Sequence, residues 1–132
     1  MPYLDAADAI NARSIRVNDA ELEPDQPWTR VPLIGGPTLR LVQLLMPPGR
    51  FTIPHYHPRA AEFFLIQACA GELWIGDGGP IPALPGDLLY APIGVIHGIV
   101  AGAPGMRLLA GMGPNDDLPN EQVEVELEGY PR

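Results

Sequence analysis

Hydrophobic residues occur in short runs that glycine and proline separate along the whole chain. The sequence holds 15 glycines and 17 prolines in 132 residues, and they are spread out rather than gathered in one tract. This distribution favours many short strands and turns over long helices. Short strands at regular spacing, with turn signals between them, are typical of a sandwich or barrel. We therefore predict an all-β fold, with one short helix-like piece near residues 6–10.

The same pattern places the individual strands. The predicted strands are 13–18, 28–34, 38–46, a segment after Pro47-Pro48-Gly49 that carries two histidines, 62–68, 72–75, 81–84, 88–91, 97–101 and 106–112. Clusters of glycine, aspartate and proline at 76–80 and 85–87 are expected to form turns.

The last part of the chain alternates apolar and acidic residues. In 122–128 the apolar positions are Val123, Val125 and Leu127, the pattern of a strand with one covered face. A barrel of this size leaves little surface to cover that row, so we predict that it pairs with a second subunit in a homodimer. The alternatives are that the tail folds back on its own barrel or is disordered.

Length and composition indicate one domain with a hydrophobic core of its own, because 46% of the 132 residues are hydrophobic. We expect a barrel core at 38–113, an N-terminal arm at 1–37 and a C-terminal tail at 114–132. The single cysteine, Cys69, excludes an intramolecular disulfide and fits a reducing compartment. Residues 1–5 have neither a basic region nor an apolar run, and no apolar stretch is long enough to span a bilayer. We expect a cytoplasmic protein.

The net charge of −8 is unevenly distributed, and every basic residue is arginine. Residues 31–113 carry four arginines against four carboxylates, so the acidic excess lies in the two ends. Nucleic acids and anionic membranes require a basic surface, and this balance argues against both as partners. The expected partner is a small-molecule substrate.

All three histidines lie in two short segments. His55 and His57 are separated by one residue, so they point the same way if the segment is a strand. Glu62 can return on the next strand beyond a proline-containing corner, and His97 follows a second segment rich in glycine and proline. Neutral imidazoles and a carboxylate suit iron, manganese, nickel, cobalt, copper or zinc. We predict that these four residues bind one divalent transition metal, with iron as the first choice.

The residues of the two segments resemble the two conserved motifs of the cupin superfamily. The residues that carry this resemblance are Gly49, His55, His57 and Glu62 for the first motif and Gly86, Pro92, Gly94 and His97 for the second. The resemblance spans roughly residues 39–112. It implies a small antiparallel β-barrel, a double-stranded β-helix or jelly roll, with a metal held by the three histidines and the glutamate. Two positions depart from the family: Cys69 stands where a glycine is usual, with Gly71 nearby, and Ala101 stands where an asparagine is usual. The first departure predicts a bulge or a longer hairpin after Glu62.

Strand alternation also predicts the walls of a pocket. The residues expected to face inward with the candidate ligands are Phe51, Ile53, Phe64, Ile66 and Ile99. The metal would then lie in an apolar cavity, which is the usual setting for small-molecule chemistry.

Two further residues are candidate catalytic groups. Tyr90 adjoins the bend before His97 and could bind substrate or transfer a proton. Arg107, like Arg40, could pair with a carboxylate substrate if it faces the cavity, although solvent exposure is the more common fate of an arginine.

The leading functional hypothesis is a metal-dependent enzyme that acts on a small organic substrate, most concretely a mononuclear Fe(II) dioxygenase. Four protein ligands leave an octahedral ion with two open positions for oxygen or a chelating substrate. A second hypothesis uses the ion as a Lewis acid in a lyase, isomerase or cyclase. A third is a non-catalytic module that holds a metal and binds a sugar or metabolite.

Overall fold

The computed structural model describes residues 28–36, 38–114 and 122–131. These residues form strands and turns, and none of them is helical. The strands are β1 (Thr29–Gly35), β2 (Arg40–Met46), β3 (His55–Tyr56), β4 (Ala61–Ile75), β5 (Pro80–Ala83), β6 (Leu88–Ala91), β7 (His97–Gly113) and β8 (Val123–Glu124). The predicted all-β fold is confirmed. The predicted strand at 13–18 and the helix-like piece at 6–10 lie outside the described residues.

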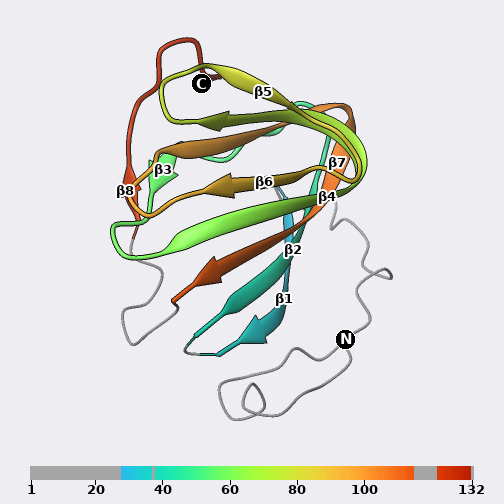
Figure 1. Cartoon of the computed structure of the whole chain (residues 1–132). Helices are drawn as coiled ribbons and strands as arrows, with labels where there is room; N and C mark the ends of the chain where they lie inside the picture. The colour runs from blue at the N-terminus through green and yellow to red at the C-terminus, as the bar shows by residue number, and fades with distance from the viewer. Residues whose placement is uncertain (1–27, 37, 115–121, 132) are drawn as a thin grey trace.

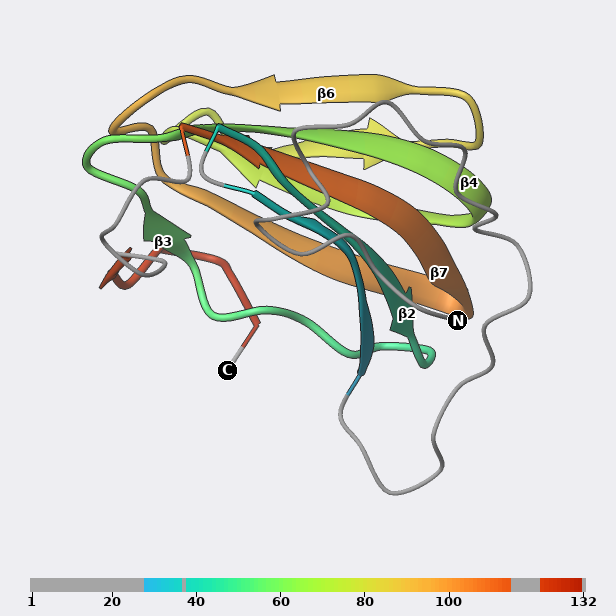
Figure 2. The same ribbon diagram turned by 90° about the horizontal axis from the view of Figure 1, so that it is seen from below.

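The strands form one antiparallel sheet that curves back on itself. Its order is β1-β2-β7-β3-β8, and β4 pairs with β7, β5 and β6. The two longest strands, β4 and β7, bend sharply at the right of Figure 1, so that each contributes to both layers of the fold. Figure 2 shows β6 lying along the outer edge of the layer that contains β4. The candidate ligands therefore lie on, or directly after, strands that this folding brings together.

Backbone irregularities in β4 allow its bend. Its register against β7 shifts between Ile66 and Ala68 and again between Cys69 and Gly71. Cys69 has a φ of 65°, a left-handed conformation that non-glycine residues rarely adopt. At Gly71 an added Cβ would collide with the carbonyl oxygen of Val100. The predicted bulge is confirmed, but the predicted separate strands 62–68 and 72–75 are one strand, as are 97–101 and 106–112, because a bulge bends a strand without ending it.

The inner face of β4 carries both core residues and a candidate ligand. Glu62, Phe64 and Ile66 are buried, whereas Phe63 and Leu65 between them are half-buried. This period of two follows from the alternation of side chains across a strand. It places a carboxylate on the same face as the hydrophobic core.

The strand that carries the first two histidines is much shorter than the sequence predicts. Only His55 and Tyr56 have strand geometry, because the flanking Pro54 and Pro58 cannot donate backbone hydrogen bonds. His55 is paired with His97 on one side and with Glu124 of the tail on the other.

The described part of the tail folds back on its own barrel. Its strand is limited to β8, which lies beside β3 at the left of Figure 1. The Val125 amide donates a hydrogen bond to the Pro54 carbonyl (2.9 Å), and the buried Tyr130 hydroxyl donates to the carbonyl of Thr52 (2.8 Å). Most of the predicted tail strand is therefore irregular, because contacts to the barrel rather than ladder pairing hold it. The homodimer stays a prediction.

The predicted N-terminal arm is part sheet, since β1 pairs with β2. Among the described residues, no helix is long and apolar enough to cross a membrane.

Candidate metal centre

Three histidines and one glutamate meet at the inner end of β3. One ligand atom from each of His55, His57, Glu62 and His97 lies within 4.8 Å of the others. His57, Glu62 and His97 are buried, and His55 is half-buried. The predicted ligand set is therefore brought together in space, from β3, the segment after it, β4 and the first residue of β7.

Backbone carbonyls orient two of the rings. His55 Nδ1 lies 2.7 Å from the carbonyl oxygen of Ile53, and His97 Nδ1 lies 3.1 Å from that of Val95. Each Nδ1–H donates to its carbonyl, which leaves Nε2 as the nitrogen that can bind a metal. This arrangement is common among metal-binding histidines.

The separations between donor atoms fit a shared cation. Glu62 Oε1 lies 3.0 Å from His57 Nε2 and 2.9 Å from His97 Nε2. Neighbouring ligands of an octahedral ion are about 3.0 Å apart when each metal–ligand distance is about 2.1 Å. Opposite ligands would be about 4.2 Å apart, so the full spread of 4.8 Å requires a small inward shift of one side chain.

The hydrogen bonds of His97 point to the same conclusion. Its two nitrogens face two acceptors, Val95 O and Glu62 Oε1, which the ring satisfies only when both nitrogens carry protons. A cation can take the place of the proton on Nε2. The residues present therefore fit a divalent transition metal, and the donor set is chemically coherent.

Charge states at the site also favour metal binding. Burial raises the pKa of the Glu62 carboxyl, but hydrogen bonds from His57 and His97 outweigh burial and hold this pKa at about 2. Burial lowers the pKa of His55, and its hydrogen bond to the Ile53 carbonyl only partly offsets that effect. At neutral pH the site thus presents an ionised carboxylate and, at His55, a neutral ring.

A cavity of about 320 Å³ opens beside the four candidate ligands. Its remaining walls are mainly apolar, with two arginines among the polar side chains. They consist of Trp28, Arg30, Arg40, Val42, Leu44, Thr52, Ile53, Phe64, Ile99, Ala110 and Gln122. The volume is that of a small-molecule site.

Three of the five residues predicted to face the pocket line this cavity. Ile53, Phe64 and Ile99 line the cavity, but Phe51 and Ile66 do not. Ile66 is buried in the core. Phe51 lies beyond the short β3, where alternation cannot be extrapolated; its ring packs edge-on against Tyr130 at a centroid distance of 5.9 Å.

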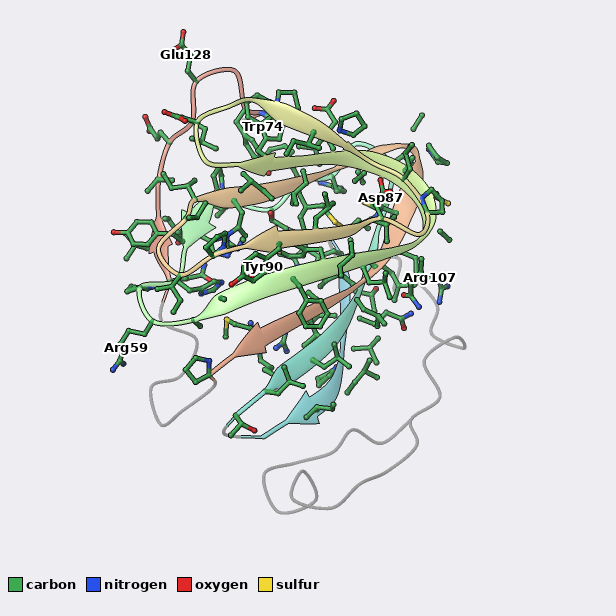
Figure 3. The ribbon with its side chains drawn as sticks, viewed as in Figure 1. Arg59, Trp74, Asp87, Tyr90, Arg107 and Glu128 are labelled. Atoms are coloured by element: carbon green, nitrogen blue, oxygen red, sulfur yellow. The ribbon has the colours of Figure 1, made fainter. Side chains whose placement is uncertain are left out.

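Neither predicted catalytic residue lines the cavity. Tyr90 is 60% exposed on β6. Arg107 lies at the end of the molecule opposite to β3 (Figure 3). The arginines that line the cavity instead are Arg40, which the sequence predicts as a candidate, and Arg30, which it does not. Arg40, Val42 and Leu44 alternate along β2, and this period could have identified them as one face.

Solved structures with the same fold include a lyase and a decarboxylase. KdgF from Halomonas sp. is 24% identical with a TM-score of 0.68, over 80% of this chain and 97% of that chain. The DMSP lyase DddQ from Ruegeria pomeroyi DSS-3 is 25% identical with a TM-score of 0.66, over 94% of this chain and 66% of that chain. Oxalate decarboxylase from Bacillus subtilis, an enzyme with Mn(II) centers, is 24% identical with a TM-score of 0.60, over 67% of this chain and 24% of that chain. Among curated proteins, no relative matches the sequence.

A family match agrees with these structural likenesses. The cupin domain matches residues 42–109, just over half of the chain. That range contains all four candidate ligands. The described strands form the antiparallel fold that these structures share. The chain therefore belongs to the cupin family, and its fold is that family's double-stranded β-helix.

Proposed function

We propose that this protein is a metal-dependent cupin enzyme that acts on a small organic substrate in the 320 Å³ cavity. The observation that carries the proposal is the convergence of His55, His57, Glu62 and His97 on the cavity wall. A divalent ion at this position would supply open coordination positions and Lewis acidity.

The chain itself would prepare the site for an anionic oxygen ligand. Glu62 contributes one negative charge, and neutral imidazole rings contribute none, so a divalent ion keeps a net positive charge. Phe64 lies beside His97, with ring centroids 5.5 Å apart, and Ile99 lies on the same wall. These apolar side chains limit the water near the site and strengthen electrostatic interactions within it.

The composition of the wall supports the choice of an oxygen-using enzyme, a mononuclear Fe(II) dioxygenase. Among the described lining residues, the candidate metal ligands are the only histidines and carboxylates. Once they hold an ion, no described side chain of the wall is left to act as a separate general base. The chemistry would then depend on the ion and its open positions.

A different observation favours the second candidate, a lyase, isomerase or cyclase that uses the ion as a Lewis acid. Arg30 and Arg40 place two positive charges on the cavity wall. Such charges would stabilise an enolate or another anion that forms during a reaction without oxygen.

Metal analysis and ligand access test the proposal. Protein purified without chelators should contain one transition metal per chain by elemental mass spectrometry. After loading with Fe(II) under anaerobic conditions, nitric oxide should give the electron paramagnetic resonance signal of an iron–nitrosyl centre, which requires an open position. A His55→Ala/His57→Ala variant is the matched control and should give neither result.

The outcomes separate the hypotheses. Oxygen uptake with a turned-over substrate identifies the dioxygenase, and turnover under strict anaerobiosis identifies the Lewis-acid enzyme. A bound metal that nitric oxide cannot reach would reject catalysis at the ion and leave a metal-holding binding module.

A further inference from the structure

A second cavity lies between the tail and the segment that leads into β3. Its volume is about 210 Å³, smaller than that of the cavity beside the candidate metal ligands. All but one of the residues that line it are apolar or aromatic. They are Phe51, Ile53, Pro54, Val125, Glu126, Leu127, Tyr130 and Pro131. An apolar cavity of roughly 150 Å³ is large enough to bind benzene, so this one has room for a single ring with a short substituent.

Several hydrogen-bond donors around the second cavity are absent or already used. Two of its residues are prolines, which have no amide hydrogen. The Val125 amide donates to the Pro54 carbonyl (2.9 Å). The Tyr130 hydroxyl donates to the Thr52 carbonyl (2.8 Å). Among the described residues that line this cavity, Glu126 is the only carboxylate and none is basic. A polar group on a ligand would therefore bind here as a hydrogen-bond donor, and most strongly if it carries a positive charge.

The segment 51–54 connects the second cavity to the candidate metal centre. Ile53 lines both cavities and is 52% exposed. Its carbonyl oxygen lies 2.7 Å from His55 Nδ1 and orients the ring of that candidate ligand. The carbonyls of Pro54 and Thr52 accept the hydrogen bonds that come from the tail. A molecule that fills the space between this segment and the tail contacts both of them.

We propose that the second cavity binds a small monocyclic amine, and that this binding is linked to metal binding at the candidate metal centre. The ring would fill the apolar space, and the ammonium group would pair with the exposed Glu126. The chain's net charge of −8 also favours a cationic ligand over an anionic one.

The link between the two sites follows from the contacts of the amine. Because its walls come from both the tail and the segment 51–54, the cavity exists only while the tail lies against the barrel. An amine that binds this conformation stabilises it, and with it the carbonyl that orients His55. The metal and the amine then raise each other's affinity by the same factor. The link rests on the proposed function; the amine site itself does not.

Equilibrium binding of three matched compounds tests the amine site. Benzylamine, benzyl alcohol and benzoate share a ring and differ in charge. Calorimetry would use metal-free protein, so that no compound can bind to an ion. Benzylamine should bind most tightly and benzoate least. Glu126→Gln should weaken benzylamine about two- to fivefold, which is what an exposed ion pair contributes, and should leave benzyl alcohol unchanged.

Further variants make the result specific to this cavity. Val125→Phe places a ring in the cavity and should abolish binding of benzylamine and benzyl alcohol. Leu127→Phe fills the same space and replaces the first variant if that one displaces the tail. The fluorescence of Trp74, whose ring is 5.4 Å from that of Tyr130, reports whether the tail is still in place.

The matched control is Glu128→Gln. This exposed carboxylate points outward in Figure 3 and is not among the lining residues, so its loss should change nothing. Benzylamine binding that survives a filled cavity would refute the site. Equal benzylamine affinity in Glu126→Gln and Glu128→Gln would refute the choice of an amine.

Competition with a chromogenic chelator tests the link to the metal. Zinc affinity should rise about fivefold in saturating benzylamine, at the lower end of the usual coupling between two sites. It should not respond to benzylamine in Val125→Phe. Equal zinc affinity with and without bound benzylamine would refute the link.

Failure of the proposed function has a different signature. A protein that binds benzylamine but no transition metal would retain the amine site and refute its link to a metal. A protein that binds metal and nitric oxide but not benzylamine would retain the metal centre without the second site.

Discussion

Two different pieces of structure hold the two halves of the candidate metal centre. Glu62 and His97 belong to β4 and β7, the longest strands, which pair with each other and enclose the core. His55 belongs to the two-residue β3, and His57 follows it, where backbone contacts come from single bridges and from the tail. The first half is thus part of the folding core, and the second is docked onto it. We infer that metal affinity and global stability depend on different residues.

The largest effect is expected from damage to the core beneath β4 and β7. Leu108 on β7 has no exposed surface, and Leu108→Ala should lower the free energy of unfolding by about 2–5 kcal/mol because it leaves a cavity. Urea unfolding measures this loss. Leu88→Ala removes the same atoms from a side chain that is 65% exposed and should be nearly neutral. Equal stability of the two variants would contradict this description of the core.

Removing a metal ligand should lower metal affinity but leave the global stability of the fold almost unchanged. His57→Ala should lower metal affinity by at least about a hundredfold, while the fold survives because the apolar core carries stability at this length. Competition with a chromogenic chelator measures the affinity, and circular dichroism reports the fold. Tyr56→Phe, on the neighbouring residue, is the matched control. Full metal occupancy in the His55→Ala/His57→Ala double variant would reject the ligand assignment.

Deleting the tail tests the docked half directly. Without residues 119–132, β3 loses its pairing with β8, so metal affinity should fall about tenfold, as it does when groups that orient ligands are removed. The unfolding transition of the barrel should change little. Metal titration and urea unfolding of the truncated chain check both statements.

The same truncation decides the oligomer prediction. If the tail joins two subunits, the full-length chain is a dimer in solution and the truncated chain a monomer. If the tail serves only its own β3, light scattering gives both chains the same number of subunits.

Much of the core half could be predicted from the sequence. Inward alternation along β4 follows from side-chain geometry, so Glu62 and Phe64 were placed on the same face correctly. The spacing of the histidines between glycine and proline signals also predicts that they meet Glu62, and the structure brings one ligand atom of each of the four residues within 4.8 Å of the others.

The docked half could not be predicted in the same way. The sequence predicts Phe51 in the pocket by extending backwards a strand that begins only at His55, and alternation carries no information about where a strand begins or ends. Arg30 and Gln122 reach the cavity through contacts between segments far apart in the chain, and no local pattern reports such contacts. Tyr130 is 5% exposed, and its ring packs so close to Gly98 that a Cβ added there would collide with it. A contact between positions so far apart in the sequence has no local signal.

The smallest expected effect concerns the tail's hydrogen bond. The Tyr130 hydroxyl lies 2.8 Å from the Thr52 carbonyl and 3.2 Å from that of Ile99. Tyr130→Phe removes this bond at a cost of about 0.5–1.5 kcal/mol in tail docking, so metal affinity should fall only a few-fold. The fluorescence of Trp74, whose ring is 5.4 Å from that of Tyr130, reports the docking.

The pH dependence of docking gives the same bond a second test. Burial raises the pKa of Tyr130 from its usual 10 to about 12. Because the docked state favours the neutral phenol, its contribution to docking is fully present below pH 10 and is lost as the pH rises towards about 12. In an alkaline titration the wild-type protein should therefore show a late tyrosinate absorbance step together with a change in Trp74 fluorescence. Tyr130→Phe should lack both, and identical curves for the two proteins would mean that the tail is not held through this hydroxyl.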